Sequence, residues 1–576
     1  MHHAVRRFQA GRFMLAACLG ALSLSWILGS CKSHSRPKAR EIVTSPEDID
    51  ARASDIISQA VEDAADNFGK LDDSTTLFQP AATKYLYDQV SDAVKWSRQE
   101  HWLPVADSLF RFLGQARYYG LLPENYHLAQ LASIRDRMAR DTGGREDRKD
   151  AVLWARADLL STDAFFQLLH DIRLGRLPND SVTLRADTVL TGAFYYKKFQ
   201  ELIQAGSLRA MAQALEPDNA DYRALKDAIP AFLDSARFGN YTFLAYPYKD
   251  SAVFVRDLLH RLNEEDSLVR DPDQPVDSLE LARYLLRYQK KRGLTPDGKF
   301  GQQVLNALNN TDAEKFIRIC ISMDRYKKLP AHMPDRYIWV NLPGYYLEVR
   351  DSDSVVIQSR IVCGKPATRT PVLTSSIYNM VTYPQWTIPT SIIVKEILPG
   401  LKKDPGYLAK KGYSLLDGKG NEVDPYFVDW SRYTRGIPYK VIQGSGDDNA
   451  LGVLKFNFGN KYAVYLHDTN QRYLFSRAVR SLSHGCVRVQ NWDQVAGYIL
   501  SCDSSAVFGA RGRYLPSDTL RRWLERKEKH TIVVHNRLPL YIRYITCVAR
   551  DGKVSFYDDV YGEDRRLRAY YTSTRQ

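Results

Sequence analysis

The chain has 576 residues, a length that predicts several domains rather than one. Hydrophobic residues make up 44% of it and aromatic residues 11%, which excludes a largely disordered protein. The formal net charge is +13, from 80 Lys and Arg against 67 Asp and Glu, but the basic residues form no concentrated stripe. This distribution argues against a nucleic-acid partner and fits a weak attraction to an anionic polymer.

The first segment, residues 1–31, has the layout of a secretory signal, because basic residues precede a short apolar run that ends in small residues. The run is too short for a membrane span. The tetrapeptide Leu-Gly-Ser-Cys that ends at Cys31 resembles the lipobox of bacterial lipoproteins. This resemblance implies a periplasmic protein that is lipid-anchored through Cys31, in the outer membrane because Lys32 is not an aspartate; a non-lipidated signal is the alternative. Residues 32–47 read as a tether.

Two helical regions follow the tether. Between residues 46 and 244 apolar side chains repeat at three- and four-residue spacing, as in Leu109, Phe112 and Leu113. Residues 250–311 repeat the pattern around a Pro-Asp-Gly turn. We expect both regions to be all-helical and assign their apolar stripes to cores rather than to chemistry.

From Tyr337 the apolar period changes to two, which predicts β-strands. Residues 393 to about 448 interrupt this alternation, and a long irregular insert beside an active site is often a lid; a structural ornament is the alternative. We expect the late strands to complete the sheet of the early ones. The predicted strands are 337–342, 345–350, 355–363, 376–383, 453–457, 461–466, 531–534, 541–548 and 553–557.

The residues that suggest chemistry gather between 461 and 493. A strand over 461–466 would deliver His467 at its end, and we expect Cys486 to open a helix over 487–500. A thiolate is the nucleophilic form of cysteine, a nearby imidazole can take its proton, and a helix N-terminus would stabilise its charge. Gly485 would let backbone N–H groups face a developing oxyanion.

The spacing is more specific than the residue types. His467, fifteen intervening residues (468–482) and Ser483-His484-Gly485-Cys486-Val487-Arg488 resemble the signature of L,D-transpeptidases with a YkuD-type catalytic domain. Residues 118–126 and 170–178 resemble the scaffold domain of the large members, and 250–311 is similar to a small three-helix peptidoglycan-binding domain. The implied fold is multi-domain α+β. It has an N-terminal all-α scaffold domain (48–245), a peptidoglycan-binding-like domain (250–311) and a mainly-β catalytic domain (335–565) with an inserted lid.

The resemblance also implies a mechanism without metal or cofactor. Cys486 would be the nucleophile and His467 the proton carrier, with the Asp468 backbone as a possible orienting group and peptidoglycan stem peptides as substrate. The product would be a 3→3 cross-link. Arg488 could bind a substrate carboxylate or lower the thiol pKa, and a structural salt bridge is an equal alternative. The further substrate-binding candidates are Ser483, His484 and Trp386.

Three other functions remain open at this stage. If water replaces the acceptor amine, the enzyme is an L,D-carboxypeptidase. His467, His484 and Cys486 could be zinc ligands of a hydrolase, although their spacing fits no metal motif and the seven cysteines form no CxxC pair. The chain could also be an inactive peptidoglycan-binding lipoprotein.

Overall fold

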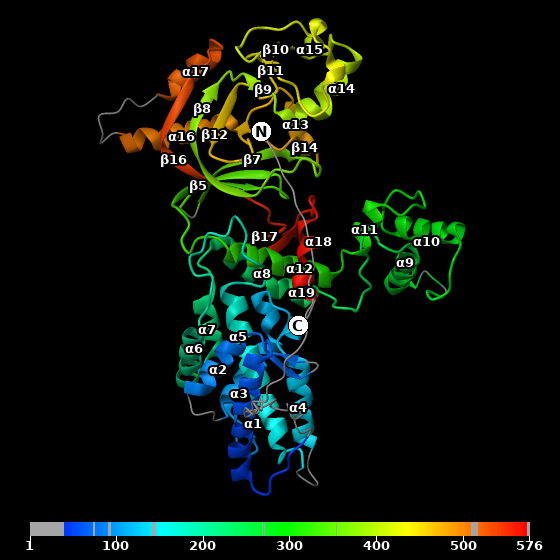
Figure 1. Ribbon diagram of the computed structural model, residues 1–576, viewed down its shortest axis with the longest axis vertical. Coiled ribbons are helices and arrows are strands. Elements are labelled where there is room, and N and C mark those ends of the chain that lie inside the picture. Colours follow the sequence, from blue (N-terminus) through cyan, green and yellow to red (C-terminus); the bar gives the residue numbers. More distant parts are fainter. Residues whose placement is uncertain are drawn as a thin grey trace, which may run out of the picture.

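The computed structural model describes residues 40–72, 75–89, 94–140, 146–267, 269, 271–352, 354–507 and 516–572. The expected signal segment, its Cys31 and most of the tether lie outside these residues. Within the described residues, no helix is both long and apolar enough to cross a membrane. Figure 1 shows a helical body at one end, a β-rich domain at the other, and a small helical domain that projects from the side.

The helical body is organised around α5, which is buried along almost its whole length. Asp150 caps the helix by accepting hydrogen bonds from the Val152 and Leu153 amides. Halfway along, the buried Asp158 carboxylate accepts the amide N–H groups of Lys95 and Trp96 at 2.7 and 2.9 Å. Its helices are α1 (Pro46–Asp66), α2 (Pro80–Gln89), α3 (Pro104–Gly114), α4 (Leu128–Arg140), α5 (Ala151–Arg173), α6 (Gly192–Ala205), α7 (Leu208–Leu215) and α8 (Ala220–Ser235), with 3-10 turns η1 (Ala116–Tyr119) and η2 (Pro123–Asn125). Two hairpins accompany them, β1 (Lys70–Asp72) with β2 (Thr75–Thr76) and β3 (Ser97–Arg98) with β4 (His101–Trp102).

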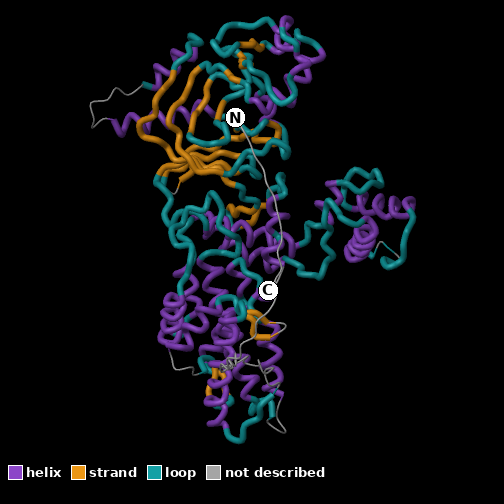
Figure 2. The backbone as a smooth tube through the Cα atoms, in the orientation of Figure 1, coloured by secondary structure: helices purple, strands orange, loops and turns teal. Residues whose placement is uncertain are grey.

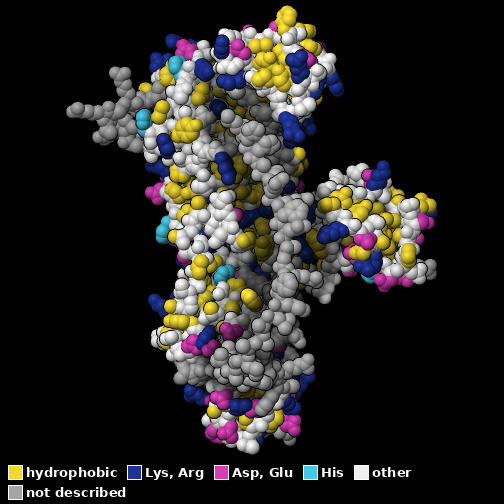
Figure 3. All heavy atoms as spheres, viewed as in Figure 1, with side chains coloured by type: hydrophobic (Ala, Val, Ile, Leu, Met, Phe, Trp, Pro, Cys, Tyr) yellow, Lys and Arg dark blue, Asp and Glu magenta, His cyan; other side chains and the backbone are white. Residues whose placement is uncertain are grey.

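The projecting domain has a core of its own, formed by α9 (Ser251–Asp266), α10 (Ser278–Lys291) and α11 (Gln302–Leu308). Its Pro-Asp-Gly turn is fixed by Gln289, which donates to Asp297 Oδ1 and accepts the Gly298 amide, both at 2.8 Å. Three helices therefore occupy the segment in which the sequence predicts a helical unit (Figure 2). The next helix, α12 (Asp312–Lys327), returns the chain to the main body, and the small domain stands out from one side of the molecule in the space-filling view (Figure 3).

The β-rich domain is built on a nine-stranded sheet in the order β14-β7-β15-β13-β12-β8-β16-β5-β6. Because β6 also pairs with β7, the sheet curls back on itself. One face buries the alternating apolar side chains of its strands against α16 (Trp492–Val507) and α17 (Ser517–Glu525). The strands are β5 (Arg336–Asn341), β6 (Tyr346–Asp351), β7 (Ser354–Gly364), β8 (Leu373–Thr382), β12 (Leu454–Phe458), β13 (Leu466–His467), β14 (Ser481–Ser483), β15 (Val487–Val489) and β16 (Thr531–Arg543).

The late strands correct one prediction. The main sheet ends at Arg543, and β17 (Cys547–Arg550) and β18 (Lys553–Phe556) form a separate hairpin. The chain leaves the sheet because the Asn341 side chain binds both the amide and the carbonyl of Ile545, at 3.1 and 3.0 Å. The hairpin instead joins a core shared with α8 and α12, which fastens the helical body to the sheet. The chain then forms α18 (Glu563–Leu567) and α19 (Ala569–Thr572).

The insert is not irregular, contrary to the prediction. It begins with β9 (Trp386–Thr387), which forms a three-stranded sheet with β10 (Tyr413–Leu416) and β11 (Lys440–Gln443), and it has its own core. Ile393, Ile397 and Leu401 are buried at four-residue spacing, a helical signal that the surrounding Gly, Lys and Asp residues obscure. Its helical segments are α13 (Thr390–Ile392), η3 (Ile393–Ile397), α14 (Leu398–Lys403), α15 (Tyr407–Lys411), η4 (Pro425–Phe427) and η5 (Trp430–Arg432).

Candidate functional site

Strand pairing brings His467 and Cys486 to the same face of the sheet. Leu466 of β13 pairs with Val487 of β15 in parallel, and both are fully buried in the core. His467 pairs with Arg488, and because side chains alternate along strands these two point away from the core, as does Cys486. On the other side of β13, Lys455 of β12 pairs with His467 and shares its face.

The approach to His467 differs from the prediction. Of the expected strand over 461–466, only Leu466 lies in a strand, the two-residue β13. The preceding residues form a loop in which Asn460 takes the place of a neighbouring strand: it donates to the Val464 carbonyl at 2.7 Å and accepts the Val464 amide at 3.1 Å. Ala463 adopts a left-handed φ of 53°, which a strand does not allow. The Cys486 Sγ lies 3.9 Å from the Ala463 carbonyl oxygen.

Cys486 does not open a helix, so the prediction of a helix N-terminus at the thiol is wrong. Val487–Val489 form β15, and α16 begins only at Trp492. The β-branched Val487 and Val489 fit a strand between β13 and β7 better than a first helical turn. The helix dipole therefore contributes nothing at the thiol.

The loop before Cys486 is held by its own hydrogen bonds. The Ser483 hydroxyl donates to the Cys486 carbonyl at 2.6 Å and accepts the Gly485 amide at 3.1 Å. Gly485 has a φ of +125°, which only glycine adopts readily. Because the Gly485 amide is occupied, the Cys486 amide, which has no partner among the described residues, is the candidate oxyanion donor of this loop.

A second segment fastens this loop from behind. The Thr370 hydroxyl donates to the Gly485 carbonyl at 2.8 Å and accepts the Gly364 amide at 2.9 Å. The Thr368 hydroxyl donates to the Ser483 carbonyl at 3.1 Å. These bonds fix the position of the thiol relative to the end of β7.

Cys486 is the least buried of the five cysteines in the described residues, since the other four are fully buried. Burial raises the pKa of its thiol, and the neighbouring Tyr465 lowers it in part. The positive charges of Lys455 and Arg488 act in the same direction as Tyr465. Cys486 is therefore a thiol in the resting state. Loss of its proton to a base would give a thiolate that two cations stabilise.

His467 is only 4% exposed, and its ring packs edge-on against Tyr465 at 5.6 Å between centroids. Burial lowers the pKa of His467 to about 3, and the positive charge of Arg488 adds to this effect. The imidazole is therefore neutral at physiological pH and can accept a proton. Its Nδ1 is buried without a hydrogen-bond partner among the described residues, which is rare for a polar atom and leaves it available.

The Asp468 carboxylate does not orient His467. It accepts the Val453 amide and an Arg472 N–H, both at 3.1 Å, and its burial raises its pKa. The backbone of Asp468 does lie close enough to His467 to favour its protonated form, as does the backbone of Leu451. The Asp468 side chain thus stabilises the loop, while the Asp468 backbone interacts with the His467 imidazole.

Arg488 has no carboxylate partner among the described residues, so the alternative of a structural salt bridge has no support there. It donates to the neutral Gln471 Oε1 at 2.9 Å, and its Nε is buried without a partner. Burial lowers its pKa. Arg488 lines a cleft of about 510 Å³ with Leu474, Arg477 and Leu482, a place where a ligand carboxylate could meet it.

The two remaining predicted residues face the insert. His484 Nε2 lies 2.5 Å from Glu396 Oε1 on η3, which links the loop before the thiol to the insert. Trp386 of β9 is half-buried, packs edge-on against Tyr413, and has an indole Nε1 without a hydrogen-bond partner among the described residues. His484 thus contacts the insert, and Trp386 is part of it.

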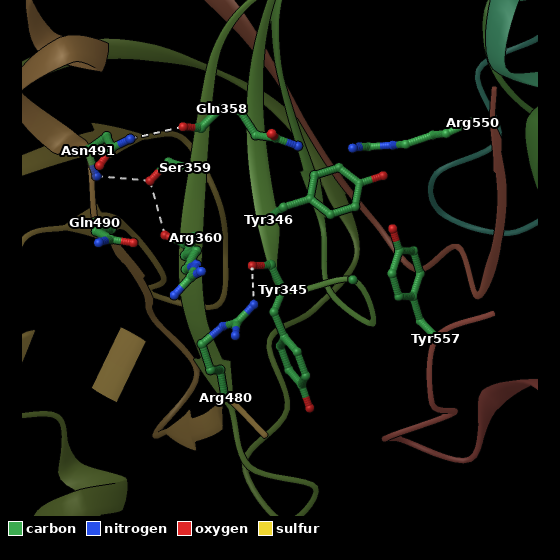
Figure 4. Close-up of a pocket in the computed structure, with 11 residues that line it drawn as sticks. Tyr345, Tyr346, Gln358, Ser359, Arg360, Arg480, Gln490, Asn491, Arg550 and Tyr557 are labelled. Atoms are coloured by element: carbon green, nitrogen blue, oxygen red, sulfur yellow. Dashed lines mark hydrogen bonds between the residues drawn. The ribbon is translucent and has the colours of Figure 1, made fainter. Parts of the chain in front are cut away.

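The thiol face continues along β7 into a second cleft of about 590 Å³ (Figure 4). The backbone N–H of Gln490 donates to the Arg360 carbonyl at 3.0 Å. Both residues line this cleft, and Gln490 follows Arg488 by two residues along the chain. Arg360 and Arg480 lie together on one side, and Tyr346 and Tyr557 lie on the other. Arg480 donates to the Tyr345 carbonyl at 3.3 Å, and burial lowers its pKa.

Sequence reasoning missed four residues of this site: Lys455, Tyr465, Thr370 and Glu396. Tyr465 precedes His467 by two residues, so strand alternation could have placed it on the same face. Lys455 alternates with buried Leu454 and Phe456 and carried the same signal. No alternation pattern could have revealed Thr370 and Glu396, because their contacts join segments that are distant in the sequence.

Metal chemistry finds no support in the geometry. In the part of the chain that the structure describes, no group of three or more His, Cys, Asp or Glu side chains could hold a metal ion. The site is instead a thiol, a neutral imidazole and two cations on an open sheet face, which are the elements of nucleophilic catalysis by cysteine.

The comparisons with known proteins name two domains. Residues 335–503 match the model of the L,D-transpeptidase catalytic domain (YkuD), and residues 81–229 match that of the Scaffold domain. A protein of Haemophilus influenzae described as "Putative L,D-transpeptidase" is 36% identical over 230 residues, which cover 40% of this chain and 45% of that protein. The alignment thus spans less than half the length of this relative.

Solved structures are more distant. An L,D-transpeptidase from Mycobacterium smegmatis is 13% identical, with a TM-score of 0.18 over 36% of this chain and 58% of that one. One from Stackebrandtia nassauensis is 13% identical, with a TM-score of 0.16 over 52% of this chain and 93% of that one. The chain carries a YkuD-type L,D-transpeptidase catalytic domain and, in its helical body, a Scaffold domain, an assignment that depends on the sequence matches alone.

Proposed function

We propose that the chain is a cysteine-dependent peptidoglycan L,D-transpeptidase that forms 3→3 cross-links between stem peptides. The observation that carries the proposal is the shared face of Cys486 and His467, flanked by Lys455 and Arg488 within the matched catalytic domain. A half-buried thiol with a raised pKa needs a base, and a buried neutral imidazole supplies one.

The proposed reaction has two steps. His467 takes the Cys486 proton as Sγ attacks the peptide carbonyl, and the Cys486 amide receives the developing oxyanion. When the C–N bond breaks, the imidazolium gives its proton to the leaving amine and a thioester remains. An acceptor amine then attacks the thioester carbonyl, its proton passes to His467, and the thiolate leaves and is reprotonated.

The substrate proposal follows from the charges around the thiol. Stem peptides carry free carboxylates, and Arg488 can bind one in the adjacent cleft because no carboxylate of the described residues pairs with it. The resting thiolate fraction is small, so catalysis depends on a substrate that is held still while the proton moves.

The test is mass spectrometry of muropeptides that have been incubated with purified protein. Wild type should form cross-linked dimers and Cys486→Ala none, while the matched control Cys502→Ala, which removes a buried thiol of the same domain, should retain activity. Shortened monomers without dimers would assign the chain as an L,D-carboxypeptidase instead. Turnover by Cys486→Ala would contradict both.

We also propose that the insert acts as a lid over the thiol. The proposal is supported by the contact of Glu396 with His484, two residues before Cys486. Glu396→Gln should raise the KM for muropeptides a few-fold with little change in kcat, since an exposed pair contributes at most about 1 kcal/mol. Unchanged kinetics would argue that the insert is an ornament.

Two further proposals concern location. Cys31 is proposed to carry a lipid that anchors the chain in the outer membrane, and Cys31→Ala should then move the protein to the soluble periplasmic fraction; pelleting of the variant with washed membranes would contradict this. Residues 250–311 are proposed to bind peptidoglycan. A chain that lacks this domain should then lose pull-down by purified sacculi, and undiminished pull-down would contradict it.

A further inference from the structure

A cavity of about 420 Å³ lies at the seam between the helical body and the catalytic domain. Its walls come from the loop after α5, the end of α12, the segment between β7 and β8, and α18 with the chain before it. This volume is in the range of small-molecule sites. Prominent among its lining residues are Leu177, Val182, Pro371, Val372, Tyr544 and Leu567, which form an apolar part.

The charge of the lining is unbalanced. Of the twenty lining residues, five are Arg or Lys and two are Asp or Glu. Three of the cations have carboxylate partners: Arg325 with Asp564 at 2.6 Å, Arg369 with Glu563 at 2.7 Å, and Arg566 with the same Glu563 at 2.6 Å. The other two, Lys328 and Arg543, have none among the described residues.

Lys328 is 5% exposed and is surrounded by neutral oxygen atoms. Its Nζ donates to the Pro178 carbonyl at 2.6 Å and the Leu177 carbonyl at 3.1 Å, with Asn179 Oδ1 at 3.5 Å. These groups satisfy the ammonium donors but do not neutralise the charge. Burial accordingly lowers the pKa of Lys328.

Arg543, which also lines the cavity, likewise has no ion-pair partner among the described residues. It is 5% exposed and donates to the Leu373 carbonyl and the Thr374 hydroxyl, both at 2.7 Å. Burial lowers its pKa to about 10. Asp180 is an acid that acts on both cations, but it is exposed and its carboxylate accepts hydrogen bonds from Val182 and Thr183.

Lys328 and Arg543 are buried beside one cavity and form no ion pair with a described carboxylate, although the charge of Asp180 acts on both and that of Asp324 acts on Lys328. Buried charges without ion-pair partners are costly unless an anion occupies the cavity. We propose that the seam cavity binds a small organic oxyanion, a carboxylate or a phosphate, between Lys328 and Arg543, with its apolar part against Pro371 and Val372. The occupant would contact Thr370, whose hydroxyl holds the Gly485 carbonyl of the catalytic loop. The site does not depend on the transpeptidase proposal.

The cavity offers near-isosteric variants for the test. Asn179→Asp adds a carboxylate beside Lys328, and Asp180→Asn removes the competing acid; both residues are exposed, so the fold should tolerate the changes. Gln213→Glu, on exposed α7 surface, is the control for net charge. Calorimetric titration of the full chain with inorganic phosphate and, separately, with succinate measures the affinity.

Wild type should bind one equivalent of at least one probe. Asn179→Asp should weaken binding about tenfold, Asp180→Asn should tighten it, and Gln213→Glu should match wild type. The preferred probe identifies the oxyanion as phosphate or carboxylate. Absence of one-to-one binding, any other order of affinities, or an equal loss in Gln213→Glu would overturn the proposal.

Discussion

Cations beneath the catalytic domain and cations around its thiol have different partners. In the shared core between the helical body and the sheet, the buried Arg176 and Lys327 and the half-buried Arg325 have buried carboxylate partners: Asp171 at 3.3 Å, Asp324 at 2.9 Å and Asp564 at 2.6 Å, respectively. On the thiol face, Lys455 and Arg488 have no carboxylate partner among the described residues. Arg325, Lys455 and Arg488 are all half-buried, so burial alone does not explain the difference.

The comparison separates structural charge from charge that is available to a ligand. Burying an ion pair costs desolvation energy, but the attraction between the two charges offsets it. Removing one partner leaves the other as an uncompensated buried charge. An unpaired cation retains that cost until a substrate carboxylate or a thiolate arrives. Breaking a pair should therefore change stability, whereas changing the thiol face should change turnover.

The largest effect is expected on the thiol face. His467→Ala should lower kcat/KM by about 10²–10⁴, because the raised pKa of Cys486 leaves the thiol without a base. Steady-state cross-linking of muropeptides measures this. The control is His332→Ala, an exposed histidine before β5, which should match wild type. A His467→Ala enzyme with wild-type kcat/KM would remove the imidazole from the mechanism.

The opposite side of the comparison predicts a loss of stability. Asp564→Asn should cost about 3–5 kcal/mol, because Arg325 keeps its buried charge and loses its carboxylate. Thermal scans of the full chain should show a lower transition while activity at low temperature persists. Asp429→Asn, which breaks an exposed pair with Arg432, should change little. Equal transitions in the two variants would contradict the distinction.

Lowering the pH should reduce the stability of the folded chain through the lowered pKa of His467. The unfolded imidazole takes a proton below pH 6.5 and the buried one only near pH 3, so the unfolded state binds more protons between these values and stability falls as pH falls. From pH 7 to 4 this group alone should cost about 3 kcal/mol. His467→Gln should lose that component of the acid sensitivity in pH-dependent unfolding, and an unchanged profile would show that His467 titrates normally.

The smallest expected effect concerns Arg488. Arg488→Gln should lower kcat/KM roughly 10–100-fold, the contribution of one charge-assisted hydrogen bond, mainly through KM. Arg488→Lys should recover part of the loss because it restores the charge without the two-pronged geometry. Little change in the unfolding transition is expected, since Arg488 forms no ion pair with a carboxylate of the described residues. A loss of stability without a rise in KM would class Arg488 with the structural cations.

Alternation and spacing sufficed for much of the domain. The early strands, such as β5, agree with the prediction. Ile338 and Val340 of β5 lie in the core of the sheet, and Tyr337 and Trp339 are buried on its other face in the core shared with the helical body. His467 and Cys486 were predictable as neighbours from spacing, and strand pairing does place them on one face. The role of each in catalysis stays a prediction.

Two of the errors share a physical cause, which is that an Asn side chain binds backbone groups that a continuing strand would have paired. Asn460 satisfies the backbone of Val464, so an apparently alternating run is a loop. Asn341 does the same for Ile545 and ends the main sheet early. The paired cations of the shared core were invisible, since Arg325 and Asp564 are far apart in sequence.

The most direct test of the central claim is intact-protein and peptide mass spectrometry after exposure to a carbapenem. Its strained carbonyl should acylate a thiol that His467 can deprotonate, without added metal. We predict one adduct per chain, located on Cys486, absent from Cys486→Ala, slow in His467→Ala and retained in Cys502→Ala. An unmodified Cys486 after prolonged exposure, or an adduct that persists in Cys486→Ala, would contradict the account of this site.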